Sequence, residues 1–95
     1  MDKLKRYRGL CHFIEGEYKF IEQLKEMEVF ADTTEYQQQS YKRIEEWEQE
    51  RQQIADYIKS ISNERYRVMY YLFYIKRMTK RAIAEQLGID ERYLH

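Results

Sequence analysis

The stretch Thr79-Lys-Arg-Ala-Ile-Ala-Glu-Gln-Leu-Gly-Ile-Asp-Glu-Arg-Tyr-Leu-His95 decides the fold of the C-terminal part of this 95-residue chain. Its pattern predicts a short helix, a sharp turn and the start of a second helix. One broad face of this helix carries Ile83, Ala84 and Leu87, and the small side chain of Ala84 allows the next helix to cross closely. Gly88 permits the positive φ of a sharp turn. The residues that carry this prediction are Ile83, Ala84, Leu87, Gly88, Ile89 and Leu94.

A helix-turn-helix of this kind usually places its second helix in the major groove of DNA. Thr79 is expected to cap the first helix, over residues 80–87, and Asp90 to cap the second. The given sequence stops at His95, about one and a half turns into that second helix. We therefore expect a DNA-binding motif that is incomplete at its distal end.

Two amphipathic segments precede this motif, one over residues 2–30 and one from the break at residues 31–35 to about Ser60. The first apolar stripe consists of Leu4, Tyr7, Leu10, Cys11, Ile14, Tyr18, Ile21 and Leu24. The second has the alternating spacings of a heptad seam and consists of Ile44, Trp47, Arg51, Ile54, Ile58 and Ile61. Two such stripes joined by a short turn predict an antiparallel helical hairpin.

The break between the two segments favours a helix start. Asp32, Thr33 and Thr34 are all N-cap types, and the pair Asp32 and Glu35 has the spacing of a capping box. Arg51 lies within the second apolar stripe, where a cation needs a partner. A glutamate on the facing helix is the expected partner.

A third helix is expected between the hairpin and the turn. Ser62 is the expected cap of a helix from Asn63 to about Arg77, and apolar residues nearly encircle it, which predicts the central helix of a core. The predicted fold class is all-α: a long antiparallel helical hairpin followed by a three-helix, helix-turn-helix domain with a short last helix. The expected domain boundary divides residues 1–61 from residues 62–95.

Composition favours a helical, cytoplasmic protein. The chain contains no proline and three glycines, which suits long helices. No run approaches the roughly 20 apolar residues that cross a bilayer, and Glu15 and Glu17 interrupt the most apolar early stretch, against a signal peptide. The single Cys11 cannot form an internal disulfide.

The zero net charge hides an asymmetry along the chain. Residues 61–95 carry seven basic and four acidic side chains, whereas residues 9–60 carry six basic and twelve acidic. A basic end suits a DNA contact confined to that end, and ordinary surface variation is the alternative.

Ten tyrosines are a second unusual feature. Tyrosines near arginines can stack on nucleic acid, but at helical spacing packing is their more common role.

The segment from Asn63 to Asp90 resembles region 4 of sigma factors and the small phage-encoded late-transcription activators of the ArpU and RinA type. The resemblance rests, in chain order, on Tyr74-Ile75, on Thr79 and on the stretch 83–89. Those phage regulators often carry a helical, coiled-coil-like N-terminal half. The resemblance implies a transcriptional regulator, encoded by a phage or mobile element, that binds double-stranded DNA from residue 79 onward.

Two groups of side chains are expected to contact DNA. The phosphate-binding group surrounds the start of the first motif helix and consists of Lys76, Arg77, Thr79, Lys80 and Arg81. The second group follows the turn and consists of Glu91, Arg92, Tyr93 and His95. We expect Arg92 to bind guanine, Glu91 to accept from cytosine and Tyr93 to reach phosphate. Asp90 is interpreted as a cap rather than a base contact.

The hairpin is expected to be a dimerisation or partner-binding arm, for a homodimer or for a protein such as RNA polymerase. The expected interface consists of Ile14, Ile21, Ile44, Trp47, Arg51, Ile54 and Ile58. One alternative is that the hairpin only supports the C-terminal domain. Another is a protein-interaction module, an inhibitor or adaptor of a host or phage protein, with the helix-turn-helix as its scaffold.

Catalysis is not expected. His12 and His95 lie at opposite ends of the sequence, and Cys11 and His12 point about 100° apart on a helix. No metal-ligand spacing occurs, and the many glutamates fit solvated helix faces. We expect no cofactor, no metal, no small-molecule substrate and no membrane partner.

Overall fold

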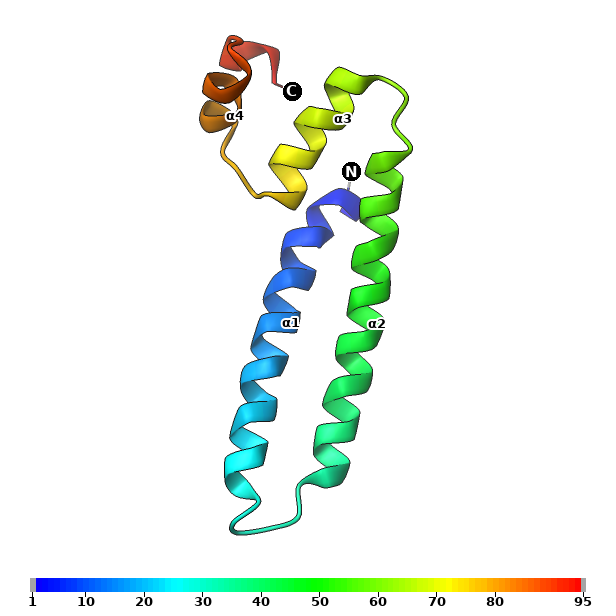
Figure 1. Cartoon of the computed structure of the whole chain (residues 1–95), viewed down its shortest axis with the longest axis vertical. Helices are drawn as coiled ribbons and strands as arrows, with labels where there is room; N and C mark the ends of the chain where they lie inside the picture. The colour runs from blue at the N-terminus through cyan, green and yellow to red at the C-terminus, as the bar shows by residue number, and fades with distance from the viewer. Residues whose placement is uncertain (1, 95) are drawn as a thin grey trace. The chain divides into compact units, whose positions relative to one another are not determined.

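The computed structural model describes residues 2–94, which are helical without any strand (Figure 1). The elements are α1 (Asp2–Met27), α2 (Thr34–Lys59), α3 (Glu64–Tyr70), the π-helix η1 (Tyr71–Ile75), α4 (Lys80–Leu87) and the 3-10 helix η2 (Glu91–Tyr93). Two long helices that pack against each other are followed by shorter ones, so the predicted all-α class is confirmed.

The chain forms two compact units. The hairpin unit comprises residues 9–52, and the terminal unit comprises the residues up to Arg8 together with those from Gln53 onward. The start of α1 and the end of α2 therefore belong with the C-terminal helices. The two compact units meet at residues 8/9 and 52/53, whereas the expected domain boundary lies between residues 61 and 62. That domain boundary stays a prediction.

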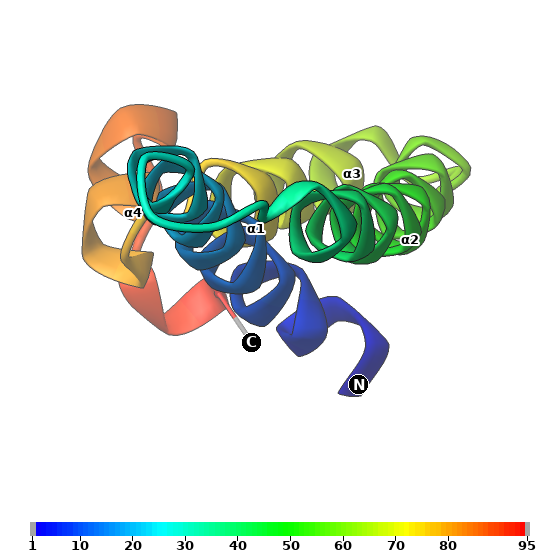
Figure 2. The ribbon, with the colours of Figure 1, turned by 90° about the horizontal axis from the view of Figure 1, so that it is seen from below.

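Within the hairpin unit, α1 and α2 lie side by side and antiparallel, as Figure 2 shows from the end that carries their connection. Ile14, Ile21 and Ile44 form a buried cluster, and Trp47 packs against it. The ring of Trp47 also packs against Phe13, with ring centroids 5.5 Å apart. The predicted hairpin is confirmed, and its apolar seam serves as its own core.

The connection between the two helices is organised by Thr33, which is 3% exposed. Its carbonyl accepts the first helical hydrogen bond of α2, from the N–H of Gln37 at 2.9 Å. Its hydroxyl donates to the carbonyl of Leu24, in the last turn of α1, at 2.9 Å. One side chain thus links the end of one helix to the start of the next.

The start of α2 differs from the expected capping box. The carboxylate of Asp32 accepts from the N–H of Thr34 at 3.0 Å. The carboxylate that accepts from the N–H of Thr33, at 3.3 Å, belongs to Glu28 and not to Glu35. Glu28 takes this role because the short connection brings the end of α1 beside the start of α2.

Two polar pairs join α1 and α2. Arg43 donates to Glu17 Oε1 from Nη2 at 2.6 Å and from Nε at 3.1 Å. The half-buried Arg51 donates from Nη1 to the sulfur of buried Cys11 at 3.7 Å. A thiol, which is a weak acceptor, therefore lies where a glutamate partner was expected.

In the terminal unit, the third helix is capped by Asn63 and not by Ser62. Asn63 Oδ1 accepts from the N–H of Tyr66 at 3.1 Å. The helix continues through η1, where the N–H of Lys76 donates to the carbonyl of Tyr71 at 3.1 Å, the wider spacing of a π-helix. The expected helix is present, with its start one residue later and its end at Ile75.

This third helix is buried on one side only. Met69 and Leu72 are buried, whereas Tyr66, Val68 and Tyr71 are 53%, 39% and 42% exposed. The prediction of a central helix surrounded by core is therefore wrong. The pattern misleads because tyrosine counts as apolar in a helical stripe although its hydroxyl favours water.

The Glu17–Arg43 pair predicts a pH-dependent stability. Burial alone raises the pKa of Glu17, but hydrogen bonds from Arg43 and Ser40 and the charge of Arg43 hold that pKa below its ordinary value of 4.5. Because the folded-state pKa is lowered, the contribution of Glu17 is complete above about pH 4.5 and is lost as the pH falls through the folded-state pKa. In urea unfolding, wild type should be more stable than Glu17→Gln at neutral pH, by a margin that shrinks on acidification.

Glu22→Gln, on the exposed side of α1, is the matched control for the loss of one carboxylate. A margin between wild type and Glu17→Gln that stays constant with pH would contradict the prediction.

Candidate nucleic-acid interface

The first motif helix begins as expected. Thr79 has extended backbone angles (φ −72°, ψ 157°), and its Oγ1 accepts from the N–H of Ala82 at 3.1 Å. Helix α4 then covers the expected residues 80–87. This start leaves Lys80 and Arg81 in the first turn, where unpaired N–H groups carry partial positive charge.

The turn after α4 depends on Gly88, whose φ of 68° and ψ of 33° confirm the expected left-handed conformation. The N–H of Ile89 donates to the carbonyl of Ala84 at 3.0 Å, and the N–H of Gly88 to that of Glu85 at 3.4 Å. These two hydrogen bonds form a Schellman motif. The motif satisfies the last carbonyls of α4 and turns the chain sharply.

The second motif helix is the single 3-10 turn η2 in the described residues. Asp90 caps it as expected, accepting from the N–H of Arg92 at 2.9 Å. The N–H of Leu94 donates to the carbonyl of Glu91 at 3.0 Å, which is 3-10 spacing where an α-helix was expected. Leu94 then enters a buried cluster, here named the motif core, that consists of Met69, Leu72, Ile83, Ala84 and Leu94.

The expected phosphate-binding residues are all exposed along one segment, from the end of η1 to the first turn of α4. They are Lys76, Arg77, Thr79, Lys80 and Arg81. Lys76 Nζ lies 5.8 Å from the ring centroid of Tyr71, and Arg81 Nε lies 3.6 Å from Glu85 Oε1. Both members of the latter pair are more than 70% exposed, so an incoming phosphate replaces it at little cost.

Arg77 has an unusual backbone conformation for a residue with a side chain. Its φ of 57° lies in the left-handed region that mainly glycine adopts. The chain leaves η1 at this point, and the N–H of Met78 donates to the carbonyl of Leu72 at 3.1 Å. Strain of this kind persists where the surrounding structure fixes the path of the chain.

The expected base-reading residues are arranged differently from the prediction. Arg92 donates to Asp90 from Nη2 at 2.9 Å and from Nε to both carboxylate oxygens at 3.2 Å. Hydrogen bonds from the Arg92 side chain and then from its backbone lower the pKa of Asp90. Glu91 and Tyr93 are exposed, and His95 lies outside the described residues. The guanidinium expected to read guanine is thus directed to the capping carboxylate.

Most residues expected at a dimer or partner interface lie inside the chain's own core. Those with no more than 4% exposure are Ile14, Ile21, Ile44, Ile54 and Ile58. Trp47 and Arg51 are half-buried. Heptad spacing predicts an apolar seam but not whether the facing helix belongs to another chain. The most exposed apolar side chains of the hairpin are Val29 (85%) and Phe30 (89%), in its connection.

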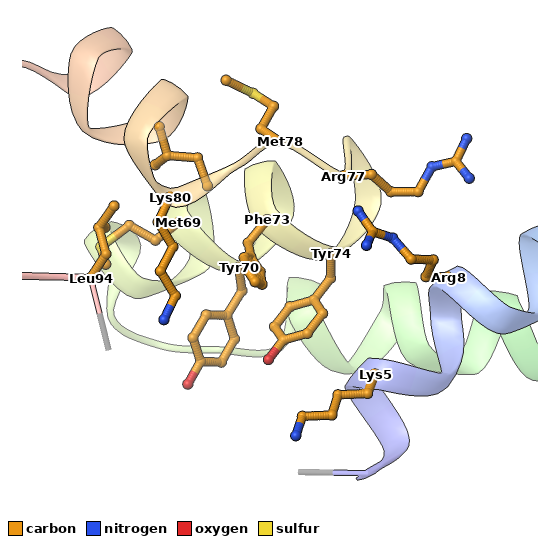
Figure 3. Close-up of a pocket in the computed structure, with 11 residues that line it drawn as sticks. Lys5, Arg8, Met69, Tyr70, Phe73, Tyr74, Arg77, Met78, Lys80 and Leu94 are labelled. Atoms are coloured by element: carbon orange, nitrogen blue, oxygen red, sulfur yellow. The ribbon is translucent and has the colours of Figure 1, made fainter. Parts of the chain in front are cut away.

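Sequence reasoning does not predict a pocket of ≈ 430 Å³ in the terminal unit (Figure 3). Its aromatic residues are Tyr70, Phe73 and Tyr74, and its cationic residues are Lys5, Arg8, Arg77 and Lys80. Lys5 and Arg8 come from the start of α1, far from the others in sequence. The basic N-terminus and the tyrosine cluster are visible separately in the sequence, and only the fold joins them.

No protein-family model, curated protein or solved structure matches the chain. The resemblance to sigma-factor region 4 therefore stays a prediction.

Within residues 2–94, no three His, Cys, Asp or Glu side chains group closely enough to hold a metal ion. No helix in the same range is long and apolar enough to cross a membrane.

Gly88→Ala is expected to lower the free energy of unfolding by about 1–2 kcal/mol, because a Cβ is strained in the left-handed conformation. No heavy atom lies within 4 Å of the added Cβ, so the backbone alone carries this cost. Gly16→Ala is the matched control, since its helical site is equally open, and it should raise stability by about 0.5–1 kcal/mol. Urea unfolding measures both, and the same sign for both variants would contradict the assignment of the turn.

Proposed function

We propose that this protein is a DNA-binding transcriptional regulator that contacts double-stranded DNA through the segment from Lys76 to Tyr93. The observation that carries the proposal is the exposed basic run at the start of α4. Residues 76–84 include four cations and no acidic residue, and the cations are exposed. Basic side chains beside free helix N–H groups are well suited to bind DNA phosphates.

The two parts of the motif have different roles in this proposal. Contacts from Lys80 and Arg81 to phosphate position the protein, whereas Arg92 contributes sequence preference by binding guanine. For this, Arg92 exchanges the Asp90 carboxylate for the guanine edge. Both members of that ion pair are exposed, Arg92 by 84% and Asp90 by 43%, which makes the exchange inexpensive.

The resemblance to sigma-factor region 4 supports further parts of the proposal. The regulator is of phage or mobile-element origin, works in the cytoplasm and has RNA polymerase as a protein partner. A homodimer places two motifs on two half-sites. Because the hairpin isoleucines are buried within the chain, such a dimer uses exposed residues instead.

A protein-interaction module is the second candidate, and the tip of the hairpin favours it. Val29 and Phe30 are adjacent and almost fully exposed, and Met27 beside them is 49% exposed. Exposed apolar groups in one place often mark a protein contact. In this alternative the protein inhibits or recruits a partner through the tip, and the motif is a scaffold.

Selection from a random duplex library at low and moderate salt tests the proposal. A DNA-binding regulator should enrich one sequence. The logarithm of its binding constant should fall linearly with the logarithm of the salt concentration, with a slope of about −0.9 per phosphate contact. The double variant Val29→Ser/Phe30→Ser should select the same sequence. No enrichment at either salt concentration would contradict the DNA-binding proposal and would favour a protein contact through the tip of the hairpin.

Lys80→Ala is expected to reduce overall DNA affinity, whereas Arg92→Ala is expected to reduce sequence preference. Lys80→Ala should weaken binding to selected and random duplexes alike and lower the salt slope by about 1. Arg92→Ala should reduce the preference for the selected duplex by about 1–3 kcal/mol. Titrations of both duplexes measure these effects, with Lys42→Ala on the exposed side of α2 as the control. Equal losses on both duplexes for both variants would refute the division of roles.

Asp90→Asn is expected to strengthen binding to the selected duplex. Asparagine keeps the cap of η2, while the loss of the carboxylate releases Arg92 and removes a negative charge near DNA. The expected gain is up to about fivefold, the scale of an exposed ion pair. Asp90→Ala, which also removes the cap, is the comparison variant. Unchanged or weaker binding by Asp90→Asn would contradict a competition between Asp90 and DNA for Arg92.

A further inference from the structure

The pocket in the terminal unit has an aromatic floor (Figure 3). Tyr70 ends α3, and Phe73 and Tyr74 lie in η1. The ring of Tyr74 makes T-shaped pairs with Tyr70, at a centroid distance of 5.7 Å, and with Phe73, at 4.9 Å. All three side chains are half-buried, and the rings do not stack flat on one another. Because they are only half-buried, part of each ring stays accessible to a planar group.

The rim of the pocket carries charge of one sign. Lys5 and Arg8 extend from the start of α1, and Lys80 extends from α4 (Figure 3). Arg77 is the fourth cation, and no carboxylate is among the described residues that line the pocket. Burial, and then the neighbouring Tyr70, raise the pKa of Tyr74, so its hydroxyl stays neutral at physiological pH. The pocket therefore favours an anion.

The size of the pocket suits a small planar ligand rather than a duplex. A volume of ≈ 430 Å³ falls in the range of pockets that hold small molecules, about 300–1,000 Å³. Bases in a duplex are stacked and paired, so they cannot lie on protein rings, whereas an unpaired base can.

We propose that this pocket binds an unpaired nucleotide. The base packs against the aromatic floor, and the phosphate lies at the basic rim, to which Lys5, Arg8 and Lys80 contribute. A free nucleotide and a nucleotide within a single strand both have this chemistry. The inference is independent of duplex binding by the motif, although Lys80 takes part in both.

Fluorescence anisotropy of the full chain with a short labelled single strand tests the proposal. The strand should bind, and an unlabelled duplex of the same sequence should compete less well than the unlabelled strand. Displacement by a mononucleotide would identify free nucleotides as ligands, and binding without such displacement would identify a strand. Strand binding that Tyr74→Leu and Lys5→Gln both leave unchanged would overturn the proposal, as would no binding of strand or mononucleotide.

Paired variants separate the pocket from the rest of the surface. Tyr74→Leu keeps bulk but removes the ring, and should weaken strand binding at least about fivefold, whereas Tyr74→Phe should not. Tyr71→Leu, on the same helix but outside the pocket, is the control. Lys5→Gln should weaken binding and lower the salt slope by about 0.7, the value for one phosphate contact to a single strand, and Lys42→Gln should do neither.

The remaining variant distinguishes this inference from the proposed function. Arg81 lies next to Lys80 but does not line the pocket. Arg81→Gln should weaken duplex binding and leave strand binding intact. Strand binding that depends on Arg81 but not on Lys5 or Tyr74 would overturn the inference. Strand binding through the pocket by a chain that selects no duplex would overturn the proposed function and leave the inference standing.

Discussion

The burial of Leu94 in the motif core is the packing constraint on which the C-terminal part of the structure depends. Leu94 is 5% exposed and joins Ile83 and Ala84 because Gly88 turns the chain through a left-handed conformation. A helix as short as α4 is marginal alone, so its order comes from this packing. The same packing fixes the backbone of Lys80 at the start of α4.

Three basic side chains of this segment have weak partners within the chain. Arg81 lies near Glu85, Arg92 is hydrogen-bonded to Asp90, and Lys76 lies over the Tyr71 ring. Exposed ion pairs contribute little to stability because water screens them. A phosphate can therefore replace the carboxylate partners of Arg81 and Arg92 at little cost.

Local features of the fold were predictable from sequence because their causes are local. Thr79, Gly88 and Asp90 act within a few residues of themselves, and each has the expected role. Asn63 was missed in favour of Ser62 because both are good N-caps and only the geometry distinguishes them. The left-handed Arg77 had no sequence signal, since arginine rarely adopts this conformation.

Features that depend on distant residues were less predictable. The heptad seam correctly indicated a hairpin, but spacing does not show that Ile44 finds its apolar partners within the same chain. Cys11 as the partner of Arg51 depends on the relative register of two helices. The pocket combines Lys5 with Tyr74, which are far apart in sequence, so the periodicity of apolar residues does not predict the pocket.

In the proposed complex, duplex DNA contacts the C-terminal basic segment, residues 76–93, and not the hairpin unit, residues 9–52. The most direct test is an NMR titration of the isotope-labelled full chain with duplex DNA at low salt, observing every backbone amide. The amides of residues 76–93 should shift on binding, while those of residues 14–47 should keep their positions. Shifts confined to the hairpin, or no shifts at all, would contradict a DNA contact at the basic segment.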